Sequence, residues 1–135
     1  MKYWLLKTDA DTYSFDDLVR DGGTDWDGVR NYQARNNLRL MMPGDLAFIY
    51  HSVTDKAIVG IAEIVSEYFP DPTDIEGKWA AVKIKPLRKL ANIITLDQIK
   101  LIPQLSELPL IKQSRLSVMP ISDEEFELIN KLADK

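Results

Sequence analysis

The strongest constraint on the fold is the apolar run Leu46–Tyr50, which contains aromatic and branched residues that favour β-strands. A turn is expected at 54–56, and a second strand pattern follows over Ala57–Phe69, with Gly60 as a predicted bulge or bend. A third run, Trp79–Pro86, alternates apolar residues with lysines and predicts a half-exposed strand. Three strand patterns in the middle of the chain indicate that a β-sheet forms the core.

Short helical patterns accompany these strands and begin at residues whose side chains can cap a first turn. The expected caps are Ser14, Thr95 and Ser122, and a further helix is expected from Asn31 to Met41. The remaining predicted strands are Tyr3–Lys7 and Leu116–Ile121. The 135 residues suffice for one domain, 1–135, and the patterns predict an α+β fold, with a small bent sheet or barrel of five or six strands and peripheral helices.

The composition narrows the class of protein. Hydrophobic residues make up 45% of the chain and charged residues 28%, which is typical of a globular protein. The absence of cysteine excludes disulfides and thiolate metal sites. The first residues resemble no secretory leader, and no apolar run has the length of a membrane span. We expect a cytoplasmic protein, and predict a monomer that binds no metal, cofactor or membrane.

The charge distribution is uneven. A net charge of −4 argues against a protein that binds nucleic acid of any sequence through a basic surface. Residues 78–115, however, contain eight basic side chains and only two acidic ones. This segment is either a solvated basic strand and loop or a locally positive surface that contacts phosphates.

The segment Asp25–Arg39 has the most unusual composition, because planar polar side chains surround Trp26 and Tyr32. Aromatic rings beside planar donors and acceptors suit a planar heteroaromatic ligand such as a nucleobase. Trp26 stands in a polar Trp-Asp-Gly sequence, where a core tryptophan is not expected. Asp27 and Asn31 lie close to Trp26 and could read the edge of a base, and Arg115 could hold phosphate or stack on a base.

Two other classes of function remain open from these residues. An enzyme, either a hydrolase or a nucleotide-processing enzyme, would use His51 or Lys7. Neighbouring strand residues point to opposite faces, so His51 and Ser52 do not readily pair as a base and a nucleophile. A single histidine without cysteine also disfavours a zinc site. A protein-interaction module would use the acidic first half of the chain against a basic partner.

Several runs together resemble the EVE domain family of the PUA-like superfamily. They are YWLLKTD, YSFDDL, WDGVRNYQARNNLR, GDLAFIYHS, VGIAEIV, WAAVKIKPL and SRLSVMPI, in this order along nearly the whole chain. The sequence departs from the family at Thr8-Asp9-Ala10-Asp11, where a Lys-Ser-Glu-Pro pattern is usual. Thr8 keeps a hydroxyl, Asp9 is shorter than Glu, and the proline is absent.

The resemblance implies a PUA-like β-barrel with peripheral helices that reads modified bases in DNA or RNA without an enzymatic step. A flipped base would be held in an aromatic-lined pocket formed by Lys7, Thr8, Trp26, Val29, Asn31, Tyr32, Tyr50, His51, Ser52, Arg115, Leu116 and Ser117. The cations expected to hold the flanking phosphates are Arg30, Arg35, Lys83 and Lys85.

Overall fold

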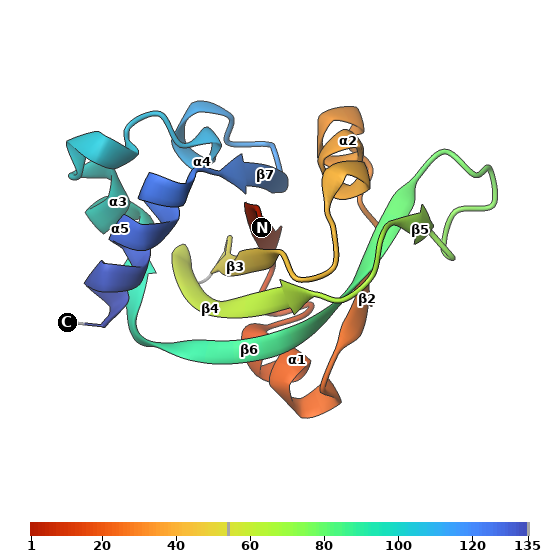
Figure 1. Ribbon diagram of the computed structural model, residues 1–135, viewed down its shortest axis with the longest axis horizontal. Coiled ribbons are helices and arrows are strands. Elements are labelled where there is room, and N and C mark those ends of the chain that lie inside the picture. The colour runs from red at the N-terminus through yellow and green to blue at the C-terminus, as the bar shows by residue number, and fades with distance from the viewer. Residues whose placement is uncertain (54, 135) are drawn as a thin grey trace.

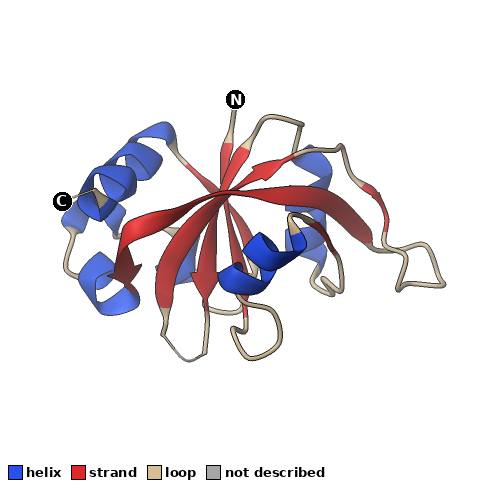
Figure 2. Ribbon diagram, turned by 90° about the horizontal axis from the view of Figure 1, so that it is seen from below, coloured by secondary structure: helices blue, strands red, loops and turns tan. Residues whose placement is uncertain are grey.

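A curled mixed sheet forms the centre of the computed structural model, which describes residues 1–53 and 55–134 (Figure 1). Its strands are β1 (Tyr3–Thr8), β2 (Thr24–Trp26), β3 (Leu46–His51), β4 (Ala57–Ile64), β5 (Phe69–Pro70), β6 (Ala80–Thr95) and β7 (Val118–Ile121). The strand order is β2-β6-β4-β3-β1-β7, with β5 also paired to β6. β1 and β3 are parallel and the other pairs are antiparallel. The strands twist strongly against one another (Figure 2), so the sheet closes only part of a barrel.

Short helices surround this half-barrel. They are α1 (Phe15–Asp21), α2 (Tyr32–Leu40), α3 (Leu96–Lys100), the 3-10 turn Pro103–Leu105, α4 (Pro109–Lys112) and α5 (Asp123–Ala133). Ser14, Thr95 and Ser122 cap α1, α3 and α5 as predicted, each accepting a hydrogen bond from the backbone N–H three residues later. Asn31 caps α2 in the same way.

The core contains one close approach between a helix and the sheet. Gly60 of β4 lies beneath the ring of Phe15, and a Cβ added at Gly60 would come within 2.4 Å of that ring. The predicted irregularity at Gly60 is present, because the registers of both β3–β4 and β4–β6 shift next to it. A glycine at this point therefore allows the first helix to rest directly on the sheet.

Two predicted strand boundaries were wrong. The strand predicted to end at Pro86 continues to Thr95, because Pro86 lies beside a register shift where the missing N–H does not interrupt pairing. The strand predicted over Ala57–Phe69 ends at Ile64 and is followed by the separate two-residue β5. The sheet consequently has more strands than the five or six expected, the additional ones being short. The predicted turn at 54–56 includes Thr54, which lies outside the described residues.

No helix in the described part of the chain is both long enough and apolar enough to cross a membrane.

Candidate functional site

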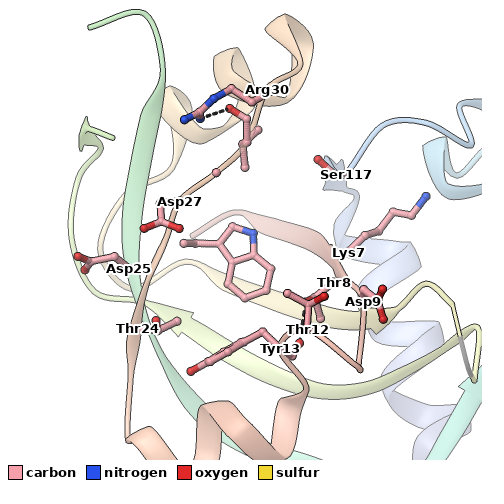
Figure 3. A pocket seen from close by; sticks show the side chains of 13 residues that line it. Lys7, Thr8, Asp9, Thr12, Tyr13, Thr24, Asp25, Asp27, Arg30 and Ser117 are labelled. Carbon is pink, nitrogen blue, oxygen red and sulfur yellow. Dashed lines mark hydrogen bonds between the residues drawn. The ribbon is translucent and has the colours of Figure 1, made fainter. Parts of the chain in front are cut away.

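A cavity of about 480 Å³ opens between β1, the segment Thr12–Tyr13, β2 with the loop that follows it, and Ser117 (Figure 3). One wall consists of Thr24, Asp25, Trp26 and the loop 27–30, and the other contains Lys7, Thr8, Asp9 and Ser117. The residues that line it are Lys7, Thr8, Asp9, Thr12, Tyr13, Thr24, Asp25, Trp26, Asp27, Gly28, Val29, Arg30 and Ser117. The volume lies within the usual range for pockets that bind small ligands.

Trp26 supplies the large aromatic surface of this cavity. It is the last residue of β2, which pairs with β6 so that Trp26 lies opposite Val82. The ring of Tyr13 meets its indole edge to face, with centroids 6.5 Å apart. Trp26 is only partly buried, and part of its ring remains available to a ligand. The wall is therefore held by strand pairing on one side and by an aromatic neighbour on the other.

The loop after Trp26 is anchored from below by Asp71. One oxygen of this buried carboxylate accepts hydrogen bonds from the Gly28 N–H at 2.8 Å and from Arg30 Nη1 at 2.9 Å. The other oxygen accepts from the N–H and hydroxyl of Thr73. Burial by itself would raise the pKa of Asp71, but the donors from Thr73, Arg30 and Gly28 outweigh it and lower that pKa to about 2. Asp71 is thus a carboxylate that remains ionised while fixing the loop.

The pKa values of the ionisable groups on the two walls are shifted in opposite directions. Burial raises the pKa of Asp27, with additional repulsion from Asp71 and Asp25. Burial also lowers the pKa of Lys7, whose Nζ donates a hydrogen bond to the carbonyl of Ser114 at 2.7 Å. Carboxylate acceptors and an amine therefore face a partly exposed indole, an arrangement that can bind a planar group with polar edges.

Comparison with known proteins identifies the family. The family model described as "EVE domain" matches residues 2–132. The chain is an EVE domain. Thymocyte nuclear protein 1 of Rattus norvegicus is 35% identical over 166 residues, a match that covers 98% of this chain and 74% of the relative.

Solved structures agree with this membership. The NMR structure of a Rhodopseudomonas palustris protein has 44% sequence identity and a TM-score of 0.94, with 99% of this EVE domain and 94% of that chain covered. Human thymocyte nuclear protein 1, solved in complex with DNA that contains 5-methylcytosine, has 32% identity and a TM-score of 0.93, with 100% and 99% covered. These matches confirm the predicted PUA-like α+β fold.

The structure of this EVE domain brings part of the predicted pocket together. Five of the predicted residues line the cavity: Lys7, Thr8, Trp26, Val29 and Ser117. Arg30, predicted to hold a phosphate, lines it as well and pairs with Asp71. The segments near residues 7 and 117 are distant in the sequence and meet because β1 pairs with β7 and the Lys7 N–H donates to the Ser117 carbonyl. Trp26 is positioned separately, by the pairing of β2 with β6.

The other predicted pocket residues lie outside the cavity. Tyr50 and Leu116 are buried in the core, and His51 is buried with its Nε2 accepting a hydrogen bond from the Phe15 N–H at 3.1 Å. Ser52 donates its hydroxyl to the Thr8 carbonyl and so supports a cavity residue from behind. The remaining three, Asn31, Tyr32 and Arg115, are exposed and do not line it.

The predicted phosphate contacts differ in how their charge is compensated. Lys83 pairs with Asp25 at 2.8 Å and Lys85 with Glu63 at 3.8 Å. Among the residues that the structure describes, Arg35 donates to neutral oxygens only, those of the Asn36 side chain and the Lys78 carbonyl. The locally positive segment in the sequence is therefore partly neutralised by residues from elsewhere in the chain.

Six residues that line the cavity were not predicted to do so: Asp9, Thr12, Tyr13, Thr24, Asp25 and Gly28. Asp27, predicted to read the edge of a base, does line it. The sequence contains a usable signal for Asp25 and Gly28 as well, because they lie next to the Trp-Asp pair that the sequence singled out. Tyr13 and Thr24 had no such signal, since Tyr13 is placed at the cavity by its ring contact with Trp26 and Thr24 by the pairing of β2 with β6.

Within residues 1–53 and 55–134, no group of three or more His, Asp or Glu side chains is placed to hold a metal ion. The polar groups of the cavity are instead arranged as separate donors and acceptors around one aromatic wall.

Proposed function

We propose that this EVE domain binds a modified nucleobase of DNA or RNA in the cavity beside Trp26 and performs no reaction on it. The base is extruded from its strand, and its ring lies against the indole. Asp27 and Asp25 accept hydrogen bonds from its donors, while Lys7 and Ser117 face its acceptors.

The observation that carries this proposal is Trp26, which packs against the core yet keeps part of its ring exposed inside a cavity of about 480 Å³. An indole that served only the core would be covered, whereas a base-stacking wall must present a free face. The relative from human, which shares the fold at a TM-score of 0.93, was solved with 5-methylcytosine DNA and supports the same class of ligand.

The placement of the candidate catalytic groups supports binding over catalysis. His51 is buried and its Nε2 is occupied by the Phe15 N–H, so it has no route to a ligand in the cavity. Lys7 reaches the cavity, where its Nζ donates one hydrogen bond to the Ser114 carbonyl and keeps its other N–H groups for the acceptors of a base. Mass spectrometry of a modified oligonucleotide after incubation with the protein should show an unchanged mass, and any altered base would favour the enzymatic alternative.

The deciding test is Trp26→Ala, measured by binding of single-stranded oligonucleotides that carry one central cytosine, 5-methylcytosine or another modified base. The wild-type protein should prefer at least one modified base over cytosine. Removing the indole should weaken that binding by about 1–3 kcal/mol, the usual contribution of stacking on an aromatic side chain.

Leu101→Ala is the matched control, because Leu101 is an exposed apolar residue at the C-terminal end of α3 and does not line the cavity. It should leave the affinity unchanged. A wild-type protein without preference for any modified base, or a Trp26→Ala variant that retains the preference, would overturn the proposal.

A further inference from the structure

A second aromatic and cationic surface lies along α2 and is separate from the cavity. We call it the α2 strip and define it as Tyr32, Arg35, Arg39, Tyr68 and Trp79. The rings of Tyr32 and Trp79 are stacked at a tilt, with centroids 5.0 Å apart. The Arg35 guanidinium carbon lies 4.9 Å from the Tyr32 centroid, and that of Arg39 lies 5.8 Å from the Tyr68 centroid.

Two rings of the α2 strip are open to solvent. Tyr32 is 58% exposed and Tyr68 is 49% exposed. Tyr32, Arg35 and Arg39 are three and four residues apart, so they share one face of the helix. Rings needed only for packing would be covered. These two rings are exposed, and each lies beside a guanidinium group, which also offers a flat surface on which a base can stack.

Among the described residues, the two arginines of the α2 strip lack the carboxylate partners that most cations of the basic segment 78–115 have. The basic segment 78–115 meets carboxylates through Lys78, Lys83, Lys85, Arg88, Lys89 and Lys112. Within the described part of the chain, neither Arg35 nor Arg39 forms an ion pair. Arg35 is held instead by uncharged oxygens, which fix its plane without cancelling its charge.

Arg30 connects the α2 strip to the cavity. It lines the cavity wall, and its guanidinium carbon also lies 5.6 Å from the centroid of Trp79. Asp74 accepts a hydrogen bond from the backbone N–H of Trp79 at 2.9 Å and so fixes the backbone that carries this ring. A strand that leaves the cavity over Arg30 therefore reaches Trp79 and Tyr32 first and Arg39 with Tyr68 afterwards.

We propose that the α2 strip binds the unpaired nucleotides that flank the base held in the cavity. The inference rests on the function proposed above and extends it to single-stranded nucleic acid as the preferred form. A neighbouring base stacks on Tyr32 and the Arg35 plane, and the phosphates beyond it contact Arg35 and Arg39. The rise from Tyr32 to Arg39 is about 10 Å, which corresponds to roughly three stacked nucleotides at 3.4 Å each.

The test compares two probes, free 5-methyldeoxycytidine and a short single-stranded DNA with one central 5-methylcytosine. Tyr32→Ala should weaken binding of the oligonucleotide about tenfold and leave binding of the nucleoside unchanged. Tyr32→Phe should retain the affinity of the oligonucleotide, because it keeps the ring. Trp26→Ala should weaken binding of both probes.

Salt dependence tests the cations separately. Arg35→Gln and Arg39→Gln should each lower the slope of log affinity against log salt by about 0.7, the amount expected per phosphate contact on a single strand. Lys100→Gln is the matched control, because Lys100 is an exposed lysine of α3 on the opposite side of the molecule in Figure 1. It should leave the slope unchanged. Equal melting temperatures confirm that the variants remain folded.

Each outcome is decisive. The proposal for the α2 strip is overturned if Tyr32→Ala leaves the affinity for the oligonucleotide unchanged and both arginine variants leave the salt slope unchanged. The proposed function of the cavity would then still stand. Slopes that fall equally in Lys100→Gln overturn it as well. Weaker binding in the α2 strip variants but not in Trp26→Ala supports the strip and overturns the cavity function. A wild-type protein that binds neither probe overturns both.

Discussion

Asp71 is 2% exposed, and its carboxylate holds the cavity loop through the Gly28 N–H and the Arg30 guanidinium. Its contribution should be visible in the stability of the protein, because the hydrogen bonds favour the ionised form. At the scale of single residues, the candidate site therefore depends on a side chain that does not line the cavity.

Asp71→Asn should lower the free energy of unfolding at pH 7 by about 2 kcal/mol, the equivalent of a pKa displaced from 3.8 to about 2. The folded-state pKa lies below the unfolded value, so this stabilisation is present above pH 3.8 and is lost as the pH falls towards 2. The difference between wild type and variant should therefore shrink over that interval. Urea unfolding at pH 7 and at pH 2–4 measures it.

The matched control is Glu67→Gln, at an exposed carboxylate, which should change the stability little at either pH. A stability loss in Asp71→Asn that is the same at all these pH values would show that shape, and not charge, holds the loop.

At the scale of elements, Asn31 joins the cavity loop to α2. Its side-chain oxygen accepts a hydrogen bond from the Ala34 N–H at 2.9 Å, which makes it the N-cap of the helix. From sequence, Asn31 was predicted to read the edge of a base. Asn31 does not line the cavity. Its role as the helix cap explains why an asparagine occupies this position, with no need for a bound base.

Capping and base reading can be separated with two substitutions at this position. Asn31→Ala should destabilise the protein by about 1 kcal/mol, because it removes the cap. Asn31→Asp should keep the stability, since the carboxylate is an equally good cap. Chemical unfolding measures the stability, and oligonucleotide binding is followed in parallel. Loss of binding in the stable Asn31→Asp variant would restore the predicted contact with the base.

At the scale of the whole molecule, the C-terminal helix closes onto the first strand. Phe126 of α5 stacks on Tyr3 at a centroid distance of 3.9 Å and on Phe48 of β3 at 4.7 Å. The two ends of the chain therefore stabilise one another through a single aromatic cluster.

Phe126→Ala should cost about 3–5 kcal/mol of unfolding free energy, because it leaves a cavity between two strands and a helix. Thermal or urea unfolding measures it, and Phe126→Leu, which retains most of the apolar volume, should cost less. A loss below 1 kcal/mol would indicate that α5 is not part of the cooperative unit.

The sequence alone was sufficient wherever a few neighbouring residues determine the outcome. The caps at Ser14, Thr95 and Ser122 depend on side chains three residues from their donors, and the central strand Leu46–Tyr50 depends on local composition. Trp26 was singled out because a tryptophan between polar residues is itself a local anomaly.

Only the tertiary structure decided which residues surround Trp26. Tyr13, Asp9 and Ser117 reach the cavity through strand pairing and helix packing between segments up to about a hundred residues apart in the chain, and no local pattern encodes such contacts. The same long-range pairing neutralised Lys83 through Asp25 and left the charge of Arg35 exposed to a ligand. Local chemistry thus specified the elements and the aromatic wall, while the fold selected the polar groups and cations that act with it.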